Sequence, residues 1–267
     1  MGVMSMRGLA VGLALLVGLL LGLLGGGGSI LMVPLLTYVA GLDPQEAIAS
    51  SLFVVGVTSL LSVALHARAG HVRWGTGALF GAAGMVGALL GGLLGSALPG
   101  PVLMIGFAIV MLLSARGMIR GRRGGASTVR AEAADPAEVR PRLGGLLSAG
   151  VGVGMVTGLV GAGGGFLIVP ALVLMAHLPM SVAVGTSLLV IAMQTLAGFV
   201  GKMAGVDLDW PFIGVLTGLA FLGALIGVAV GNRVPDKALK TGFGWFVLLM
   251  GLGVLGVEVA GLVRAAA

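Results

Sequence analysis

Eight apolar stretches, each long enough to cross a lipid bilayer, follow one another along this chain of 267 residues. A membrane-spanning helix needs about 20 apolar residues. Read between polar and proline breaks, the stretches are 8–40, 46–65, 75–98, 101–119, 143–176, 180–201, 211–231 and 240–262. Hydrophobic residues make up 58% of the chain and charged residues only 9%, too few to cover a soluble domain. The sequence therefore predicts an all-α fold, a polytopic bundle of about eight transmembrane helices.

Positive charge is concentrated in one hydrophilic stretch near the middle of the chain. Seven of the 15 Lys and Arg residues lie between positions 116 and 142, without the interleaved aromatic residues of a nucleic-acid-binding surface. Cytoplasmic loops of membrane proteins carry an excess of Lys and Arg. If every stretch crosses once from a cytoplasmic N-terminus, 66–73 and 120–142 are cytoplasmic and Asp43 is outside. With the same succession of single crossings, Asp207 is inside, Arg233 is outside and both termini are in the cytoplasm.

The two halves of the chain are related by a shift of 136 positions. The shift places Gly22 to Pro34 on Gly158 to Pro170 and, without a gap, Trp74 on Trp210. We expect a tandem duplication, with a four-span repeat in 1–119, a basic cytoplasmic linker in 120–142 and a second four-span repeat in 143–267. Four crossings per repeat make the repeats parallel. If 8–40 enters and returns instead, the repeats are inverted; that alternative puts the linker outside, and the charge rule disfavours it.

A glycine cluster interrupts the first apolar stretch of each half. Each glycine costs a helix interior about 1 kcal/mol relative to alanine, and unwound backbone in a bilayer is tolerated only inside protein or beside a watery cavity. Paired interruptions indicate a transport site, and the free N–H groups that follow favour an anion. The alternative is that the glycines only let helices pack closely. The predicted substrate-binding residues here are Gly25, Gly26, Gly27, Gly28, Ser29, Pro34, Gly161, Gly163, Gly164, Gly165 and Pro170.

Polar residues within the apolar stretches add to this predicted site. Ser51 and Thr58 are seven residues apart, as are Ser187 and Gln194, so each pair shares a helix face. We expect Ser51, Ser187 and Gln194 to donate to the oxygens of a bound anion. The alternative is that the hydroxyl groups bond to carbonyls of their own helices.

Three charged or titratable residues near span ends are further candidates for binding or coupling. Lys202 aligns with His66 and either attracts an anion or extends to the lipid headgroups. Glu258 either carries a coupling proton or is solvated. The sequence has no cysteine and no cluster with metal-ligand spacing, so we expect neither a metal nor a cofactor.

The segment Gly-Gly-Gly-Gly-Ser-Ile-Leu-Met-Val-Pro34 and its partner Gly-Ala-Gly-Gly-Gly-Phe-Leu-Ile-Val-Pro170 resemble the sulfite exporter TauE/SafE family. The resemblance covers nearly the whole chain. It implies a plasma-membrane permease, not an enzyme, that moves a small sulfur-containing anion such as sulfite, a sulfonate or sulfoacetate by alternating access. Its partners would be the lipid bilayer and the anion; the coupling ion, proton or sodium, and a homo-oligomeric state stay open.

Two other functions remain as alternatives. One is a membrane assembly subunit that transports nothing, in which the glycines serve packing alone. The other is an intramembrane serine hydrolase with Ser29 as nucleophile and His177 or His66 as base. The Gly-x-Ser-Gly context of such an enzyme is missing, which disfavours this function.

Overall fold

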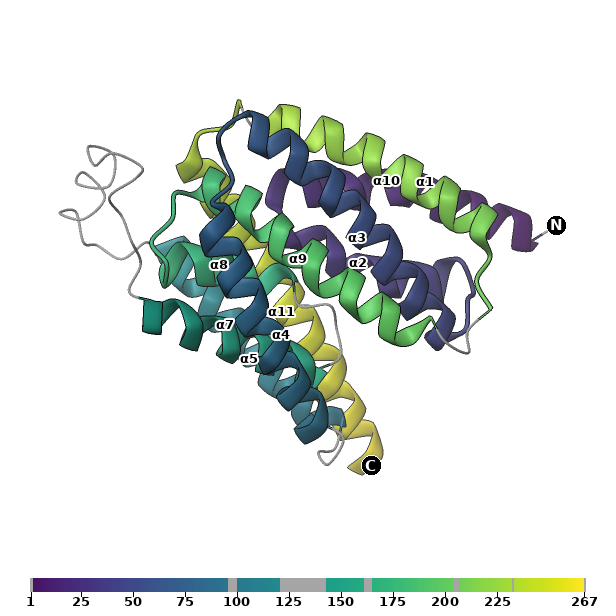
Figure 1. Ribbon diagram of the computed structural model, residues 1–267. Coiled ribbons are helices and arrows are strands. Elements are labelled where there is room, and N and C mark those ends of the chain that lie inside the picture. Colours follow the sequence, from purple (N-terminus) through teal and green to yellow (C-terminus); the bar gives the residue numbers. More distant parts are fainter. Residues whose placement is uncertain are drawn as a thin grey trace.

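The structure, a computed structural model, describes residues 2–95, 100–120, 143–160, 165–203, 207–231 and 233–266. These residues form helices joined by short turns, and they include no strand (Figure 1). The first part of the chain contains α1 (Gly2–Leu24), the 3-10 helix η1 (Gly26–Gly28), α2 (Ser29–Pro34), the π-helix η2 (Leu35–Val39), α3 (Pro44–Arg68), α4 (Trp74–Gly95) and α5 (Gly100–Arg120). The second part contains α7 (Leu143–Val160), α8 (Gly165–Leu174), α9 (Met180–Lys202), α10 (Trp210–Gly231) and α11 (Asp236–Ala266).

Five of the described helices are long and apolar enough to cross a membrane. They contain the spans Gln45–Arg68, Trp74–Gly91, Met180–Val200, Trp210–Gly231 and Asp236–Gly256. Each overlaps a predicted apolar stretch, which confirms a polytopic helical fold. The predicted stretches 8–40 and 143–176 are each divided between two or more helices, so the described residues do not form eight uninterrupted spans.

Close contacts at glycines give the direction of α3 relative to α9, two helices at corresponding positions 136 residues apart. Gly56 of α3 packs on Leu196 of α9, whereas Gly198 of α9 packs on Leu52 of α3. Residue numbers thus rise along one helix where they fall along the other, so the two helices are antiparallel. Parallel repeats require corresponding helices to run in the same direction. The expected parallel arrangement of the two halves is therefore wrong.

Two further interfaces each pair a helix of the first part of the chain with a helix of the second part. A Cβ atom added to Gly223 of α10 would overlap the carbonyl oxygen of Leu15 of α1. A Cβ atom added to Gly87 of α4 would overlap the carbonyl oxygen of Val151 of α7 in the same way. Subtracting 136 from 223 gives 87, and adding 136 to 15 gives 151, so one contact recurs at corresponding positions. The pair α1 and α10 is thus matched by the pair α7 and α4, as Figure 1 shows for α1 beside α10.

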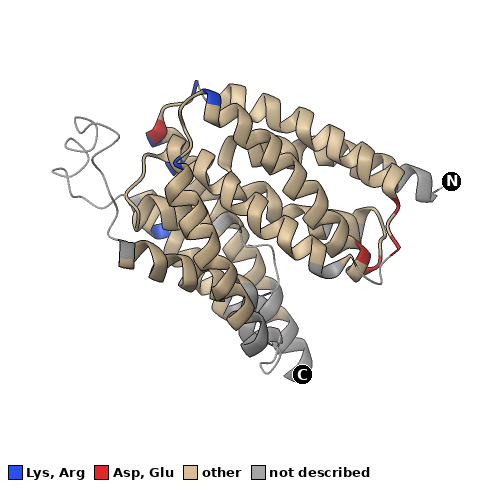
Figure 2. Cartoon of the chain, in the orientation of Figure 1, with Lys and Arg blue, Asp and Glu red and all other residues tan. Residues whose placement is uncertain are grey.

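The charged residues are sorted between the two ends of the helices. Because α3 and α9 are antiparallel, the α3–α4 and α10–α11 connections share one end, which carries Arg68 and Arg233 and is called the basic end below. The opposite end carries Asp43 and Asp207, and Figure 2 shows most Asp and Glu there, apart from Lys and Arg. Asp236 is an exception at the basic end, where its Oδ1 accepts from the Ser181 N–H at 3.2 Å.

This sorting corrects the expected positions of the charged loops. The residues of α1 and α10 that pack together rise in number along both helices, so α1 begins at the acidic end with α10. The α5 and α7 ends that flank 121–142 lie at the basic end, because α7 packs parallel to α4. The start of α1 and the helix ends that flank 121–142 therefore lie at opposite ends of the helices, and Asp207 does not share an end with Arg68.

The first glycine cluster interrupts the helix, as its composition predicts. α1 ends at Leu24, and Gly25 has φ 69°, in the region that favours glycine. Gly28 packs back on Val17 and Leu21 of α1, so the chain has reversed by this point. Since α3 then starts at the acidic end with α1, the segment 8–40 enters and returns rather than crossing once. The second cluster falls largely on 161–164, outside the described residues.

Candidate functional site

The interrupted segment meets α8 and α9 at Gly25. A Cβ atom at this position would lie 2.6 Å from Ser187 Oγ and 3.1 Å from Val169 Cγ2. Both the positive φ and the lack of space therefore require glycine here. The predicted site residues Gly25 and Ser187 are thus brought together, although their positions are 162 apart in the sequence.

Two short helices start beside this contact. Ser29 is the first residue of α2, Gly165 is the first residue of α8, and these two residues pack against each other. Gly26, Gly27, Gly28, Ser29 and Gly165 are all buried. The structure therefore places the described parts of both predicted glycine segments at one buried location between the two parts of the chain.

Four polar groups on α3 and α9 are buried without a hydrogen-bond partner among the described residues. They are Ser50 Oγ, Thr58 Oγ1, Ser59 Oγ and Gln194 Nε2. Thr58 and Gln194 are corresponding positions, 136 apart, and Gln194 Nε2 packs on Gly84 of α4. A buried donor left unpaired costs about 1–3 kcal/mol, so a bound solute or water at these groups would stabilise the protein.

Other hydroxyl groups of the predicted site bond within their own helices, as the alternative interpretation expects. Ser51 Oγ donates to the Ile48 carbonyl oxygen at 2.9 Å, and Ser187 Oγ donates to the Val184 carbonyl oxygen at 2.8 Å. Ser29 Oγ donates to the Gly26 carbonyl oxygen at 2.7 Å. These hydroxyls retain lone pairs, but their protons are already donated. The better donors for an anion are therefore the unpaired groups, of which the predicted site included only Gln194.

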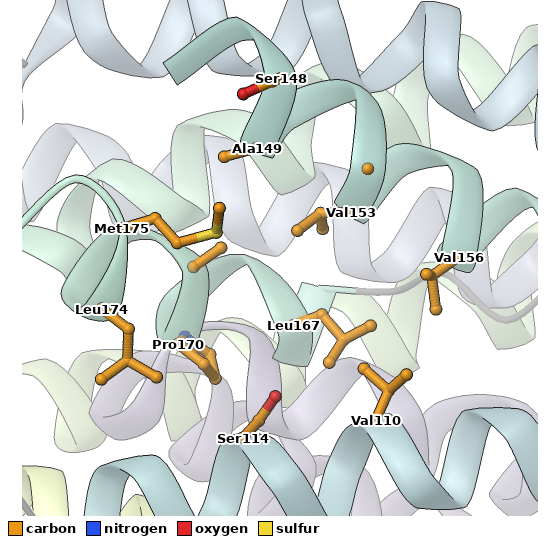
Figure 3. Close-up of a pocket in the computed structure, with 12 residues that line it drawn as sticks. Val110, Ser114, Ser148, Ala149, Val153, Val156, Leu167, Pro170, Leu174 and Met175 are labelled. Atoms are coloured by element: carbon orange, nitrogen blue, oxygen red, sulfur yellow. The ribbon is translucent and has the colours of Figure 1, made fainter. Parts of the chain in front are cut away.

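The two predicted prolines have different positions. Pro34 ends α2, and Pro170 lies inside α8, where it lines a pocket between α5, α7 and α8 (Figure 3). The pocket has a volume of about 260 Å³, and its walls are apolar except for Ser114 and Ser148. An apolar pocket of this kind does not supply the donors that an anion needs. Pro170 thus lines an apolar pocket and is not grouped with the polar side chains of α3 and α9.

Several further candidates lie outside the part of the chain that the structure describes in full. Gly161, Gly163 and Gly164 fall within 161–164, which is not described. Lys202 is the last residue of α9, at the acidic end, and Glu258 lies in the last third of α11. Among the described residues, no group of three or more His, Asp or Glu is placed to hold a metal ion.

Sequence reasoning did not select Ser50, Thr58 or Ser59 as binding residues. All three are fully buried on α3. A usable signal was present: Thr58 aligns with Gln194 and Ser59 with Thr195, so polar residues recur at corresponding positions of two apolar stretches. His66 is the other residue whose burial was not expected, since it follows the predicted span 46–65.

Comparison with known proteins supports the sequence resemblance. A family model described as "Sulfite exporter TauE/SafE" matches residues 10–254. A "Probable membrane transporter protein" of Xylella fastidiosa (strain Temecula1) is 35% identical, covering 93% of this chain and 94% of its own length. "Probable membrane transporter protein YunE" of Bacillus subtilis is 27% identical, covering 85% of this chain and 89% of its own length. No solved structure matches the chain. The chain therefore belongs to the sulfite exporter TauE/SafE family of membrane transporters.

Proposed function

We propose that this protein moves a small sulfur-containing anion, such as sulfite, a sulfonate or sulfoacetate, across the plasma membrane by alternating access. The observation that carries this proposal is the set of buried, unpaired donors on α3 and α9, namely Ser50, Thr58, Ser59 and Gln194. Neutral hydroxyl and amide donors suit the oxygens of an anion that must be bound and released again. The family match supports transport, and its name supports the sulfur-containing class.

The proposed alternating access depends on two inverted repeats. Each repeat contributes an entering and returning first segment followed by three further helices, the first repeat in 1–119 and the second in 143–267, with the linker 120–142 between them. The antiparallel α3 and α9 and the recurring contacts at positions shifted by 136 support this arrangement. Inverted repeats place equivalent barriers on the two sides of a central site, which is what alternating access needs.

Charge orients this arrangement in the bilayer. We place the basic end in the cytoplasm, because cytoplasmic loops carry the excess of Lys and Arg. The linker 120–142 stays cytoplasmic, as the sequence predicts, while the start of α1 and the end of α11 are placed outside. The second half, which fits the charge rule poorly if the repeats are parallel, fits it well in this orientation, since Arg233, Lys237 and Lys240 join Arg68 and Arg73.

The proposal is tested with Thr58→Val, assayed by exchange of radiolabelled sulfite, sulfoacetate and methanesulfonate in proteoliposomes. Valine keeps the shape of the side chain and removes the unpaired hydroxyl. A hydrogen bond to a charged group is worth about 1.5–3 kcal/mol, so the exchange rate should fall roughly tenfold or more. The empty protein should be at least as stable as the wild type, because a buried unpaired donor has been removed.

Thr217→Val is the matched control for this experiment. The Thr217 hydroxyl already donates to the Ile213 carbonyl oxygen in α10 at 2.7 Å, so its loss should leave exchange unchanged. If Thr58→Val lowers the melting temperature and leaves exchange intact, the hydroxyl is structural and the proposed site is wrong. If the wild type exchanges none of the three anions, the proposed substrate class is wrong.

A further inference from the structure

His66 is the one titratable side chain that is buried among the described residues. It is 4% exposed, whereas the described Lys, Arg, Asp and Glu side chains are all partly or fully exposed. It lies in the last turn of α3, near the basic end. A side chain that ionises near neutral pH is expensive to bury unless its charge has a use or a partner.

The surroundings of His66 leave one ring nitrogen free. Nε2 faces the Gly22 carbonyl oxygen of α1 at 3.4 Å, while Nδ1 is buried and has no partner among the described residues. On α9, Gly185 lies against this side chain, and a Cβ atom added to it would lie 3.1 Å from His66 Cβ. The loop after α3 presents His71, with ring centroids 6.3 Å apart. His71 is the titratable group that these elements place against it, and none of them places a carboxylate there.

His66 also lies near the contact between the interrupted segment and α9. Its partner Gly22 precedes Gly25, the start of the interrupted segment, by three residues. Its neighbour Gly185 precedes Ser187, which packs on Gly25, by two residues, or about 3 Å along the axis of α9. The two residues that His66 contacts on α1 and α9 are thus within one helical turn of the contact between Gly25 and Ser187, and the unpaired donor Thr58 lies eight residues, about 12 Å, from His66 along α3.

An anion bound among neutral donors brings an uncompensated negative charge into the bilayer. No Lys or Arg side chain is buried among the described residues to balance this charge. A protonated His66 would balance it, and the anion would in turn stabilise the imidazolium. We infer that His66 is a proton-binding site whose proton accompanies the anion across the membrane, so that the protein is a proton–anion symporter.

This inference rests on the proposed function. The proton comes from water on the loading side, binds Nδ1 while the anion binds, and returns to water on the opposite side when the anion leaves. An N–H bond forms and then breaks, and no oxidant or other reactant is needed. Nε2–H keeps its contact with the Gly22 carbonyl throughout, which fixes Nδ1 as the nitrogen that takes the proton.

The test compares wild type with His66→Gln in proteoliposomes, using methanesulfonate because it stays singly charged over the whole pH range. Glutamine retains an N–H donor for the Gly22 carbonyl but cannot bind a proton near neutral pH. With one proton per anion, the wild type should accumulate methanesulfonate about tenfold for each pH unit of an imposed gradient. His66→Gln should lose this accumulation and bind methanesulfonate more weakly, and its remaining exchange of labelled for unlabelled methanesulfonate at equal pH should not vary with pH.

His177→Asn is the control histidine. His177 is exposed and has φ 53°, a conformation that asparagine tolerates, so this variant should accumulate methanesulfonate like the wild type. If the wild type exchanges methanesulfonate but a pH gradient drives no accumulation, or if His66→Gln accumulates it fully, the inference is wrong and the proposed function stands. If the wild type shows no exchange of methanesulfonate, sulfite or sulfoacetate, the proposed function and this inference both fail.

Discussion

Ser29 and Gly165 occupy the same position in the two halves of the chain, 136 residues apart, and they touch. A Cβ atom on Gly165 would lie 2.8 Å from Ser29 Oγ and 2.9 Å from Ile191 Cδ1. Each residue starts a short helix, α2 or α8, so the two helix starts meet at a single point. If the two halves are inverted repeats related by a two-fold axis, as proposed above, this contact between counterparts lies at that axis.

Gly165→Ala should lower stability by about 1–3 kcal/mol, because the added methyl group is crowded by Ser29 Oγ and Ile191. The double variant Ser29→Gly with Gly165→Ala removes one of these contacts and should recover part of the loss. Melting temperature in detergent measures both effects. Equal melting temperatures for the single and double variants would contradict the contact at the axis.

Gly223→Ala should destabilise the protein more than any exposed glycine substitution in the same helix. Its added Cβ would overlap backbone atoms of Leu15 and Leu19, and backbone cannot move aside as a side-chain end can. We expect a loss of about 3 kcal/mol or more, at the upper end of overpacking costs. The measurement is the melting temperature of the purified variant.

Gly218→Ala is the matched control on α10, since nothing lies within 4 Å of its added Cβ. It should be neutral or stabilising by up to about 1 kcal/mol, the helix-propensity difference between alanine and glycine. A similar melting temperature for both variants would argue against close packing of α1 on α10.

Ala149→Leu should stabilise the protein by filling the pocket of Figure 3. The corresponding residue of the first half is Leu13, so the second half has a smaller side chain at the position where Ala149 lines the pocket. Filling a cavity commonly adds about 0.5–2 kcal/mol. Ala83→Leu is the control: Ala83 Cβ already packs tightly on Gly150 of α7, and leucine there should destabilise. A lower melting temperature for Ala149→Leu than for the wild type would show that the pocket is not open space.

Single cysteines can test the helix directions directly, because the chain has none of its own. In right-side-out membranes, an impermeant maleimide should label Gln45→Cys and Asp207→Cys together, while Ala69→Cys and Ala238→Cys should react only after permeabilisation. All four positions are exposed. Labelling that pairs position 45 with 238 would support parallel repeats and contradict the proposed orientation.

The sequence predicts helix positions well because apolar length alone determines where a helix can lie in a bilayer. The stretches 46–65 and 211–231 correspond to α3 and α10 within a few residues. The direction of the second half is not predictable in this way, since a 33-residue apolar stretch is compatible with one crossing or with entry and return. The charge rule could not separate the parallel from the inverted arrangement, because Arg68 and the linker lie at the same end of the helices in both. The prediction based on it was therefore wrong.

The candidate site is only partly predictable for a related reason. The glycine cluster at 25–28 is visible because four adjacent glycines disfavour a helix whatever surrounds them. Whether a serine or threonine donates to its own helix or remains unpaired depends on rotamer and packing, which sequence spacing does not set. Ser51 and Thr58 illustrate the difference: they share a face of α3, yet only Ser51 has a carbonyl partner.

The exchange of partners, α1 with α10 and α4 with α7, has a consequence for how this protein is made. In both pairs, the glycine-lined face of one helix packs against a helix from the other side of the linker. Neither half therefore forms a complete core by itself. A chain severed within 121–142 should yield two fragments that are degraded when synthesised separately and recovered when synthesised together. A half-length ancestor would have needed to form a dimer with a second copy inserted into the bilayer in the opposite orientation.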